Sequence, residues 1–160
     1  MHGKLCTVPL SMLGSLNKYQ IDNLLRSEVI GRIGCSADGY TYVVPVTYVY
    51  TGSVIYAHTK EGLKIDLMRK NPEVCFEVDA IRDLANWQSV IIQGTYEELE
   101  GREAEEALQA LVNRLHPMTG SETSIPRHGL DRPHSPIDPA IVLVVYRINI
   151  KEATGRYEKS

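Results

Sequence analysis

A short stretch of the chain, residues 56–64, combines residue types that could bind an anionic group. It contains His58, Thr59 and Lys64 around Gly62. If a strand ends here and a helix begins after Gly62, the first N–H groups of that helix and the positive end of its dipole favour an anion. Thr59 adds a hydroxyl donor, and Lys64 adds a point charge. The stretch therefore predicts a phosphate cradle without a Walker motif, whereas a helix cap and a solvated lysine are the simpler alternatives.

A second stretch, residues 42–48, has Pro45 in the middle of an otherwise regular strand pattern. Proline has no N–H and so removes one bond from the ladder, which is typical of an edge strand or a bulge. The functional alternative is that the backbone beside Pro45 faces a ligand, such as the polar edge of a planar heterocycle. His58 would then point toward that ring, where an imidazole can transfer a proton near neutral pH. A hydrogen-bonded structural histidine remains the alternative.

No metal site is expected. The three cysteines, Cys6, Cys35 and Cys75, are widely spaced and form no Cys-x-x-Cys pair, so they are interpreted as small buried thiols in a reducing compartment. The histidines of the proline-rich segment also lack metal-ligand spacing, namely His116, His128 and His134.

Charge and hydropathy exclude several classes of protein. Seventeen Lys and Arg against twenty Asp and Glu give a net charge of −3, which opposes a dedicated nucleic-acid binder. No apolar run reaches the roughly 18 residues of a transmembrane helix. The apolar residues 5–16 are interrupted by Pro9 and Gly14, and no small-x-small cleavage site follows. We therefore expect a cytoplasmic protein that does not bind membranes or nucleic acid.

Most of the elements that would position these residues are strands joined by tight turns. Strands are predicted over 29–36, 40–50, 54–57, 74–78, 87–99 and 141–150. Helices are predicted over 16–25, with Ser15 or Asn17 as the cap, and over 62–70 and 101–115. The pattern predicts a mainly β chain, 1–160, forming one domain: a small β-barrel with peripheral helices. Residues 116–139 hold five of the eight prolines and are expected to form a long loop.

One order of motifs covers roughly residues 17–150, and it is specific in combination although each motif is weak alone. It runs through residues 29–35, 38–39, 42–46, 55–59, 62–78, 87–94 and 146–148. This order resembles the pyridoxamine 5′-phosphate oxidase-like FMN-binding split barrels, and within them the nitroimidazole-resistance (Nim) reductase-like branch.

The resemblance implies a six-stranded antiparallel split β-barrel that forms a homodimer, with two FMN molecules at the subunit interface. The residues implied along the isoalloxazine ring are Val43, Val44, Pro45, Val46 and Thr47. Toward the phosphate the implied residues are His58, Thr59, Gly62, Leu63 and Lys64, with Arg32 as a further candidate at the ribityl-phosphate end. An exposed strand arginine is the alternative for Arg32. On the other side of the flavin the implied residues are Trp87, Gln88 and Ser89.

Three tyrosines of the second predicted strand alternate around Pro45: Tyr42, Tyr48 and Tyr50. Because alternate residues of a strand share one face, we expect these rings to line the face that meets the flavin or the partner subunit. The same tyrosines could instead form a stacking platform for nucleic acid, which the net charge opposes.

The resulting hypothesis is an FMN-dependent oxidoreductase that passes electrons to a small planar acceptor such as a nitroaromatic. A nicotinamide nucleotide is one candidate donor, and His58 is the candidate proton donor. The alternative is a non-catalytic split barrel that stores or senses FMN or haem. Pyridoxamine phosphate oxidation is less expected, because residues 147–157 lack the tryptophan of the Arg-rich segment that ends those oxidases.

Overall fold

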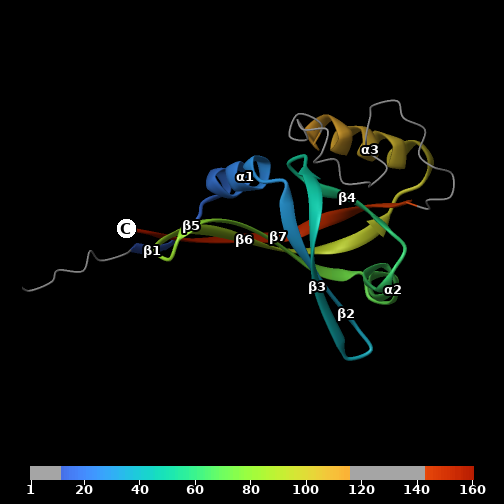
Figure 1. Ribbon diagram of the computed structural model, residues 1–160, viewed down its shortest axis with the longest axis horizontal. Helices are drawn as coiled ribbons and strands as arrows, with labels where there is room; N and C mark the ends of the chain where they lie inside the picture. The colour runs from blue at the N-terminus through green and yellow to red at the C-terminus, as the bar shows by residue number, and fades with distance from the viewer. Residues whose placement is uncertain (1–11, 116–142) are drawn as a thin grey trace, which may run out of the picture.

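The computed structural model describes residues 12–115 and 143–160 of the chain. The predicted loop 116–139, the start of the predicted last strand and Cys6 lie outside these residues. The described elements are β1 (Met12–Ser15), α1 (Lys18–Ser27), β2 (Ile30–Ala37), β3 (Tyr40–Tyr50), β4 (Val54–Lys60), α2 (Leu63–Lys70), β5 (Glu73–Asp83), β6 (Asn86–Glu98), α3 (Gly101–Leu115) and β7 (Leu143–Lys159) (Figure 1).

All seven described strands belong to one antiparallel sheet in the order β1-β7-β4-β3-β2-β5-β6. The six strands after β1 in this order begin with β7 and end with β6. These two strands also pair with each other, which closes the sheet into a six-stranded barrel. This closure is possible because β7 is long: residues 143–149 pair with β4, whereas residues 146–158 pair with β6. β1 is a seventh strand beside the far end of β7. The predicted mainly β barrel is therefore confirmed, with one strand more than expected.

The core fills the inside of this barrel. Side chains of opposite faces alternate along each strand, and the inward set includes the fully buried Ile33, Ile55, Phe76 and Ile92. The helices lie outside: α1 and α3 on one side of the long strands β5, β6 and β7, and α2 on the other (Figure 1). α1 begins with a capping box in which Asn17 Oδ1 accepts from the N–H of Gln20 at 3.0 Å.

The tyrosine-rich face of β3 corrects one sequence expectation. Tyr48 is fully buried and Tyr50 nearly so, and both belong to the barrel core. Tyr48 packs edge-on against Phe76 with ring centroids 5.1 Å apart, and its hydroxyl donates to the Leu25 carbonyl of α1 at 2.9 Å. The rings therefore face inward, and the outward face of β3 carries the residues between them, including Val43, Pro45 and Thr47.

The element boundaries show where local pattern is sufficient. β3 and α3 have the predicted limits, and the turn at Asp38-Gly39 has positive φ at both residues, as a type I′ hairpin requires. The last strand instead runs to Lys159, well beyond the predicted Ile150, because pairing with β6 and β1 supports its polar second half.

Candidate functional site

The strands β3 and β4 separate at one end, and a cavity lies there. Their ladder pairs Tyr50 to Tyr48 with Ile55 to Ala57 and then stops. Beyond this point a cavity of about 470 Å³ opens between the two strands, the start of α2 and the start of β7. Its lining residues are Ile30, Pro45, Val46, Thr47, His58, Thr59, Lys60, Lys64 and Leu143. Both stretches singled out in the sequence thus meet at one cavity.

Pro45 explains why the edge of β3 is available here. The N–H of Tyr48 donates to the Val29 carbonyl at 3.0 Å, and the N–H of Thr51 donates to Val54 of β4 at 3.1 Å. Backbone groups of successive residues point to opposite sides of a strand, so those of Pro45 and Thr47 are turned toward β4. Neither residue pairs with β4. Since Pro45 has no N–H, the edge beyond the ladder presents the Pro45 carbonyl and the Thr47 N–H to the cavity.

The other wall of the cavity is formed by Lys60 and Lys64, which flank the turn from β4 into α2. Gly62 is the N-cap of α2 and supplies no side-chain cap. Its carbonyl accepts from Ile65 at 2.9 Å and from Asp66 at 3.1 Å. The N–H groups of Leu63 and Lys64 precede these bonds and have no partner within the helix. The start of α2 therefore offers two backbone donors together with the positive end of the helix dipole.

Lys64 is the cation of this wall. It is half-buried, and in the described part of the chain it forms no ion pair with a carboxylate. Burial lowers the pKa of Lys64, an effect partly opposed by the nearby Cys35 thiol. By contrast, Lys70 at the other end of α2 holds Asp38 at 2.7 Å. A half-buried ammonium without a counter-charge is suited to an incoming anion.

His58 and Thr59 lie on β4 at the middle of the cavity wall. Both belong to the part of β4 that has left β3 but remains paired with β7, opposite Val145 and Val144. The fully paired β7 edge therefore fixes the backbone of the two residues, while the parted β3 edge leaves room beside them. His58 is half-buried and is one of the residues that line the cavity.

Several other predicted residues do not line the cavity, among them Gly62 and Leu63. Val44 packs against the barrel core, whereas Val43 is 60% exposed on the outer face of β3. Arg32 lies opposite Pro45 on β2, but its guanidinium holds Glu77 at 3.1 Å and Asp79 at 3.2 Å. Within one chain, Arg32 is therefore held in two ion pairs and does not line the cavity.

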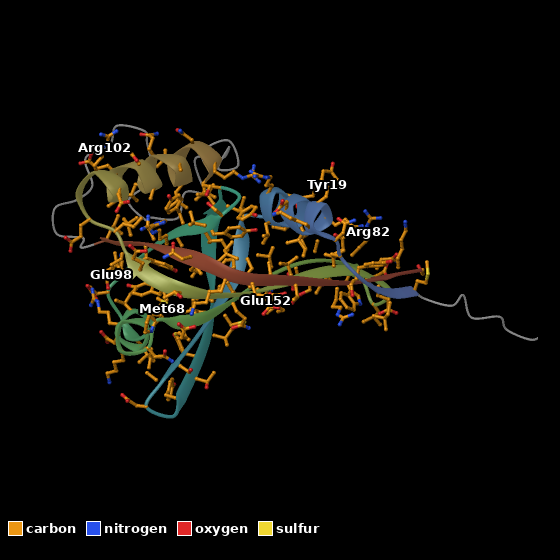
Figure 2. All side chains as sticks on the ribbon, turned by 180° about the vertical axis from the view of Figure 1, so that it is seen from behind. Tyr19, Met68, Arg82, Glu98, Arg102 and Glu152 are labelled. Atoms are coloured by element: carbon orange, nitrogen blue, oxygen red, sulfur yellow. The ribbon has the colours of Figure 1, made fainter. Side chains whose placement is uncertain are left out.

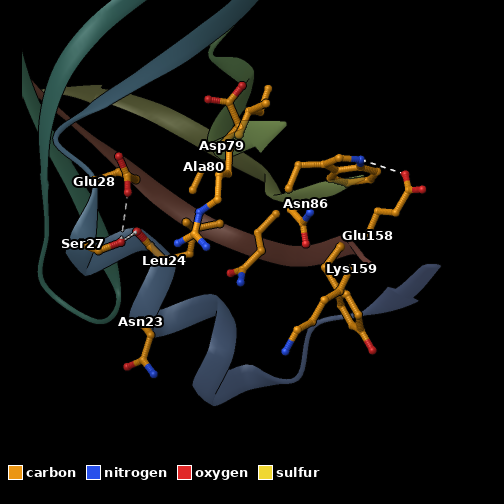
Figure 3. Close-up of a pocket in the computed structure, with 14 residues that line it drawn as sticks. Asn23, Leu24, Ser27, Glu28, Asp79, Ala80, Asn86, Glu158 and Lys159 are labelled. Atoms are coloured by element: carbon orange, nitrogen blue, oxygen red, sulfur yellow. Dashed lines mark hydrogen bonds between the residues drawn. The ribbon is translucent and has the colours of Figure 1, made fainter. Parts of the chain in front are cut away.

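Trp87, Gln88 and Ser89 lie elsewhere, at the start of β6. Trp87 and Gln88 line a separate cavity of about 830 Å³ between α1 and the ends of β5, β6 and β7 (Figure 3). The indole N–H of Trp87 donates to Glu158 at 3.0 Å. Ser89 donates to Glu77 at 3.0 Å on the outer face of the sheet. One chain therefore does not bring these residues to the first cavity.

Three lining residues were missed by the sequence reasoning: Ile30, Lys60 and Leu143. Lys60 lies within residues 56–64, and its charge alone made it a candidate for an anion site. Ile30 carried no signal beyond being an apolar strand residue, and it reaches the cavity because β2 pairs it with Thr47. Leu143 is remote in sequence and reaches the cavity through its pairing with Lys60.

The described residues contain no group of three or more His, Cys, Asp or Glu side chains that could hold a metal ion. Within the same residues, no helix is both long enough and apolar enough to cross a membrane.

The six-stranded closed ring with parted β3 and β4 defines the class of protein as a split β-barrel. A family model described as pyridoxamine 5′-phosphate oxidase matches residues 17–157. The chain therefore belongs to the pyridoxamine 5′-phosphate oxidase family, which confirms the resemblance noted in its sequence.

Known structures and relatives agree with this assignment. A FAD-binding protein from Mesorhizobium loti has 28% identity and a TM-score of 0.73, over 94% of this chain and 99% of that one. A candidate 5-nitroimidazole antibiotic resistance protein from Bacteroides thetaiotaomicron shares the fold, with 19% identity and a TM-score of 0.71 over 99% and 95% of the two chains. An uncharacterised protein of Rhizobium meliloti is 31% identical over 84 residues, which are 52% of this chain and 56% of that relative. That match thus spans little more than half of the relative.

Proposed function

We propose that this chain is a flavoprotein that binds FMN in the cavity between β3 and β4. The observation that carries the proposal is the chemistry of the two ends of this cavity. One end has the edge of β3 at Pro45 and Thr47, which β4 does not pair, and the other has Lys64, without an ion pair in the described residues, beside the donors at the start of α2. A volume of about 470 Å³ falls in the usual range for small-molecule sites.

The residues fit a flavin mononucleotide in a definite orientation. Lys64 and the N–H groups of Leu63 and Lys64 would hold the phosphate, because they supply positive charge and donors, and Lys64 forms no ion pair within the described residues. The backbone of residues 45–47 would bind the polar edge of the ring system, with apolar contacts from Ile30 and Val46. The Mesorhizobium loti relative is described as FAD-binding, and FAD shares the ring and first phosphate of FMN, so the bound flavin must be identified directly.

The proposed function is redox catalysis with a small planar acceptor, such as a nitroaromatic. A bound flavin would supply the electron transfer. The chain would supply position, exclusion of water and a proton: His58 lies on the cavity wall, where its imidazole could donate to the reduced acceptor. A nicotinamide nucleotide is the proposed electron donor.

A homodimer would complete the site. In one chain, Trp87 and Gln88 line the second cavity, away from Lys64. A partner subunit could bring its own Trp87, Gln88 and Ser89 against the open side of the first cavity. The outer face of the sheet supports this, because it exposes apolar Ile30 and Val43 beside the Arg32 ion pairs.

The first experiment is the visible spectrum of the purified protein, followed by titration of flavin-free protein with FMN, FAD and riboflavin. We expect FMN to bind more tightly than riboflavin, which lacks the phosphate. Lys64→Gln should weaken FMN by about ten- to hundredfold, as expected for loss of a charge-assisted contact, and should weaken riboflavin much less. Lys70→Gln is the matched control, since it removes a lysine from the same helix outside the cavity. A protein that binds none of the three flavins would refute the proposal.

The dimer is tested by mass and by mixing. The native mass should be twice the 17.9 kDa of one chain. Lys64→Gln and Gln88→Ala should each weaken FMN binding, and heterodimers of the two variants should regain one tight site per dimer. If the heterodimers bind no better than either variant, the site is not shared between subunits.

Catalysis is tested by turnover of a nitroimidazole with a nicotinamide nucleotide. His58→Gln should lower turnover while leaving FMN affinity within about threefold, since its role is proton donation. A wild-type rate no higher than that of free FMN would favour the alternative of a storage or sensing barrel.

A further inference from the structure

Arg69, in the last turn of α2, forms ion pairs with two carboxylates. Its guanidinium donates to both oxygens of Glu61, at 2.9 and 2.8 Å, and to both oxygens of Glu98, at 2.5 and 3.1 Å. The Tyr96 hydroxyl donates to the same Glu98 carboxylate at 2.8 Å. Glu98 lies beside α2 at the end of β6, far from Arg82 at the opposite end of the sheet (Figure 2). The result is a planar clamp that joins the loop before α2 to the barrel wall.

The position of Glu61 places this clamp next to the proposed phosphate site. Glu61 immediately precedes the N-cap Gly62, and it is the only acidic residue within residues 60–64. An acidic side chain near the start of a helix is attracted to the free N–H groups and to the dipole. Released from Arg69, the Glu61 carboxylate could therefore turn to the N–H groups of Leu63 and Lys64, or to the Lys64 ammonium. It would then compete with any bound phosphate.

We propose that Arg69 is a positioning residue that keeps the Glu61 carboxylate away from the phosphate cradle. Arg69 itself does not line the cavity. It acts by engaging both oxygens of Glu61, so that the donors at the start of the helix stay available. This inference rests on the proposed flavin phosphate site, and it assigns to the chain an internal anion that must be restrained.

The test is a set of dissociation constants for FMN and riboflavin, measured by quenching of flavin fluorescence. The proteins compared are the wild type, Arg69→Gln, Glu61→Gln and the double variant. Freeing one carboxylate near a phosphate in a partly solvated site should raise the FMN dissociation constant by about three- to tenfold. Riboflavin should change by less than about twofold, because it carries no phosphate. The double variant should return FMN affinity to within about twofold of the wild type, since no carboxylate remains to compete.

Arg147→Gln is the matched control, because Arg147 also joins two carboxylates, Glu97 and Glu103, but does not line the cavity. It should leave FMN affinity unchanged. The inference is overturned if the double variant binds FMN as weakly as Arg69→Gln, or if riboflavin weakens in parallel with FMN, since either result means that the clamp only supports the fold. A wild type that binds neither flavin overturns the proposed function as well, so the wild-type and variant results separate the two claims.

Discussion

Two fully buried tyrosines differ in a way that allows a sharp prediction about stability. Tyr48 and Tyr146 both have 0% exposure, and burial raises the pKa of both hydroxyls above the ordinary tyrosine value. The Tyr48 hydroxyl donates to the Leu25 carbonyl at 2.9 Å, whereas the Tyr146 hydroxyl has no hydrogen-bond partner in the described residues. Replacement by phenylalanine should therefore destabilise the protein at Tyr48 but not at Tyr146.

The magnitude follows from what each substitution leaves behind. Tyr48→Phe keeps the ring contact with Phe76 but leaves the Leu25 carbonyl, in the last turn of α1, without its donor. Loss of a buried hydrogen bond of this kind costs about 1–2 kcal/mol, which for a chain of this length lowers the Tm by about 3–6 °C. Tyr146→Phe removes a desolvated hydroxyl that gains nothing on folding, so it should be neutral or stabilise by up to about 1 kcal/mol.

Urea unfolding at pH 7, followed by far-UV circular dichroism, measures both changes. Tyr19→Phe is the control, because Tyr19 is 74% exposed and its substitution should leave the free energy of unfolding unaltered. The reasoning is refuted if Tyr146→Phe destabilises the protein as much as Tyr48→Phe does. That result would mean that the Tyr146 hydroxyl contributes a bond of its own.

Three further predictions concern packing, pH and the helix start. Gly31→Ala would place a Cβ 2.4 Å from Phe76 Cζ and should destabilise by about 1–3 kcal/mol in urea unfolding, whereas Gly34→Ala, with no neighbour closer than 3.6 Å, should cost less. A hydrogen bond from Tyr50 lowers the pKa of Asp22, so the stability that Asp22 contributes is present above its ordinary pKa and is lost as pH falls through the lowered value. Below pH 5, the free energy of unfolding should therefore fall less steeply with decreasing pH for Asp22→Asn than for the wild type. The same pH dependence in both proteins would contradict this. Gly62→Asp should stabilise α2 by about 0.5–1 kcal/mol, because its carboxylate would accept from the N–H groups at the helix start. For the same reason it should weaken FMN binding more than riboflavin binding, and equal weakening of both would count against a phosphate at this end.

Much of the fold could be predicted because its signals are local. The alternation of residues 40–50, the Asp38-Gly39 turn and the apolar stripe of α3 each depend on neighbours a few residues away. The place of Lys64 at the start of α2 was predictable for the same reason, since Gly62 and Lys64 are nearly adjacent, whereas the phosphate site there stays a proposal. The tyrosine face of β3 was assigned wrongly, because a tyrosine is compatible with a core or with a binding surface and the pattern of one strand does not say which face is inside.

The sequence by itself determined most of the strands, all three described helices and the two stretches that meet at the cavity, but not β1 or the second half of β7. Only the tertiary structure decided that β3 and β4 part beside Pro45, that β6 and β7 close the ring, and that Arg69 reaches both Glu61 and Glu98. It also placed Trp87 in a second cavity away from Lys64. The physical reason is that register, closure and ion pairing are set by contacts between residues far apart in the chain, and these contacts leave no trace in local periodicity.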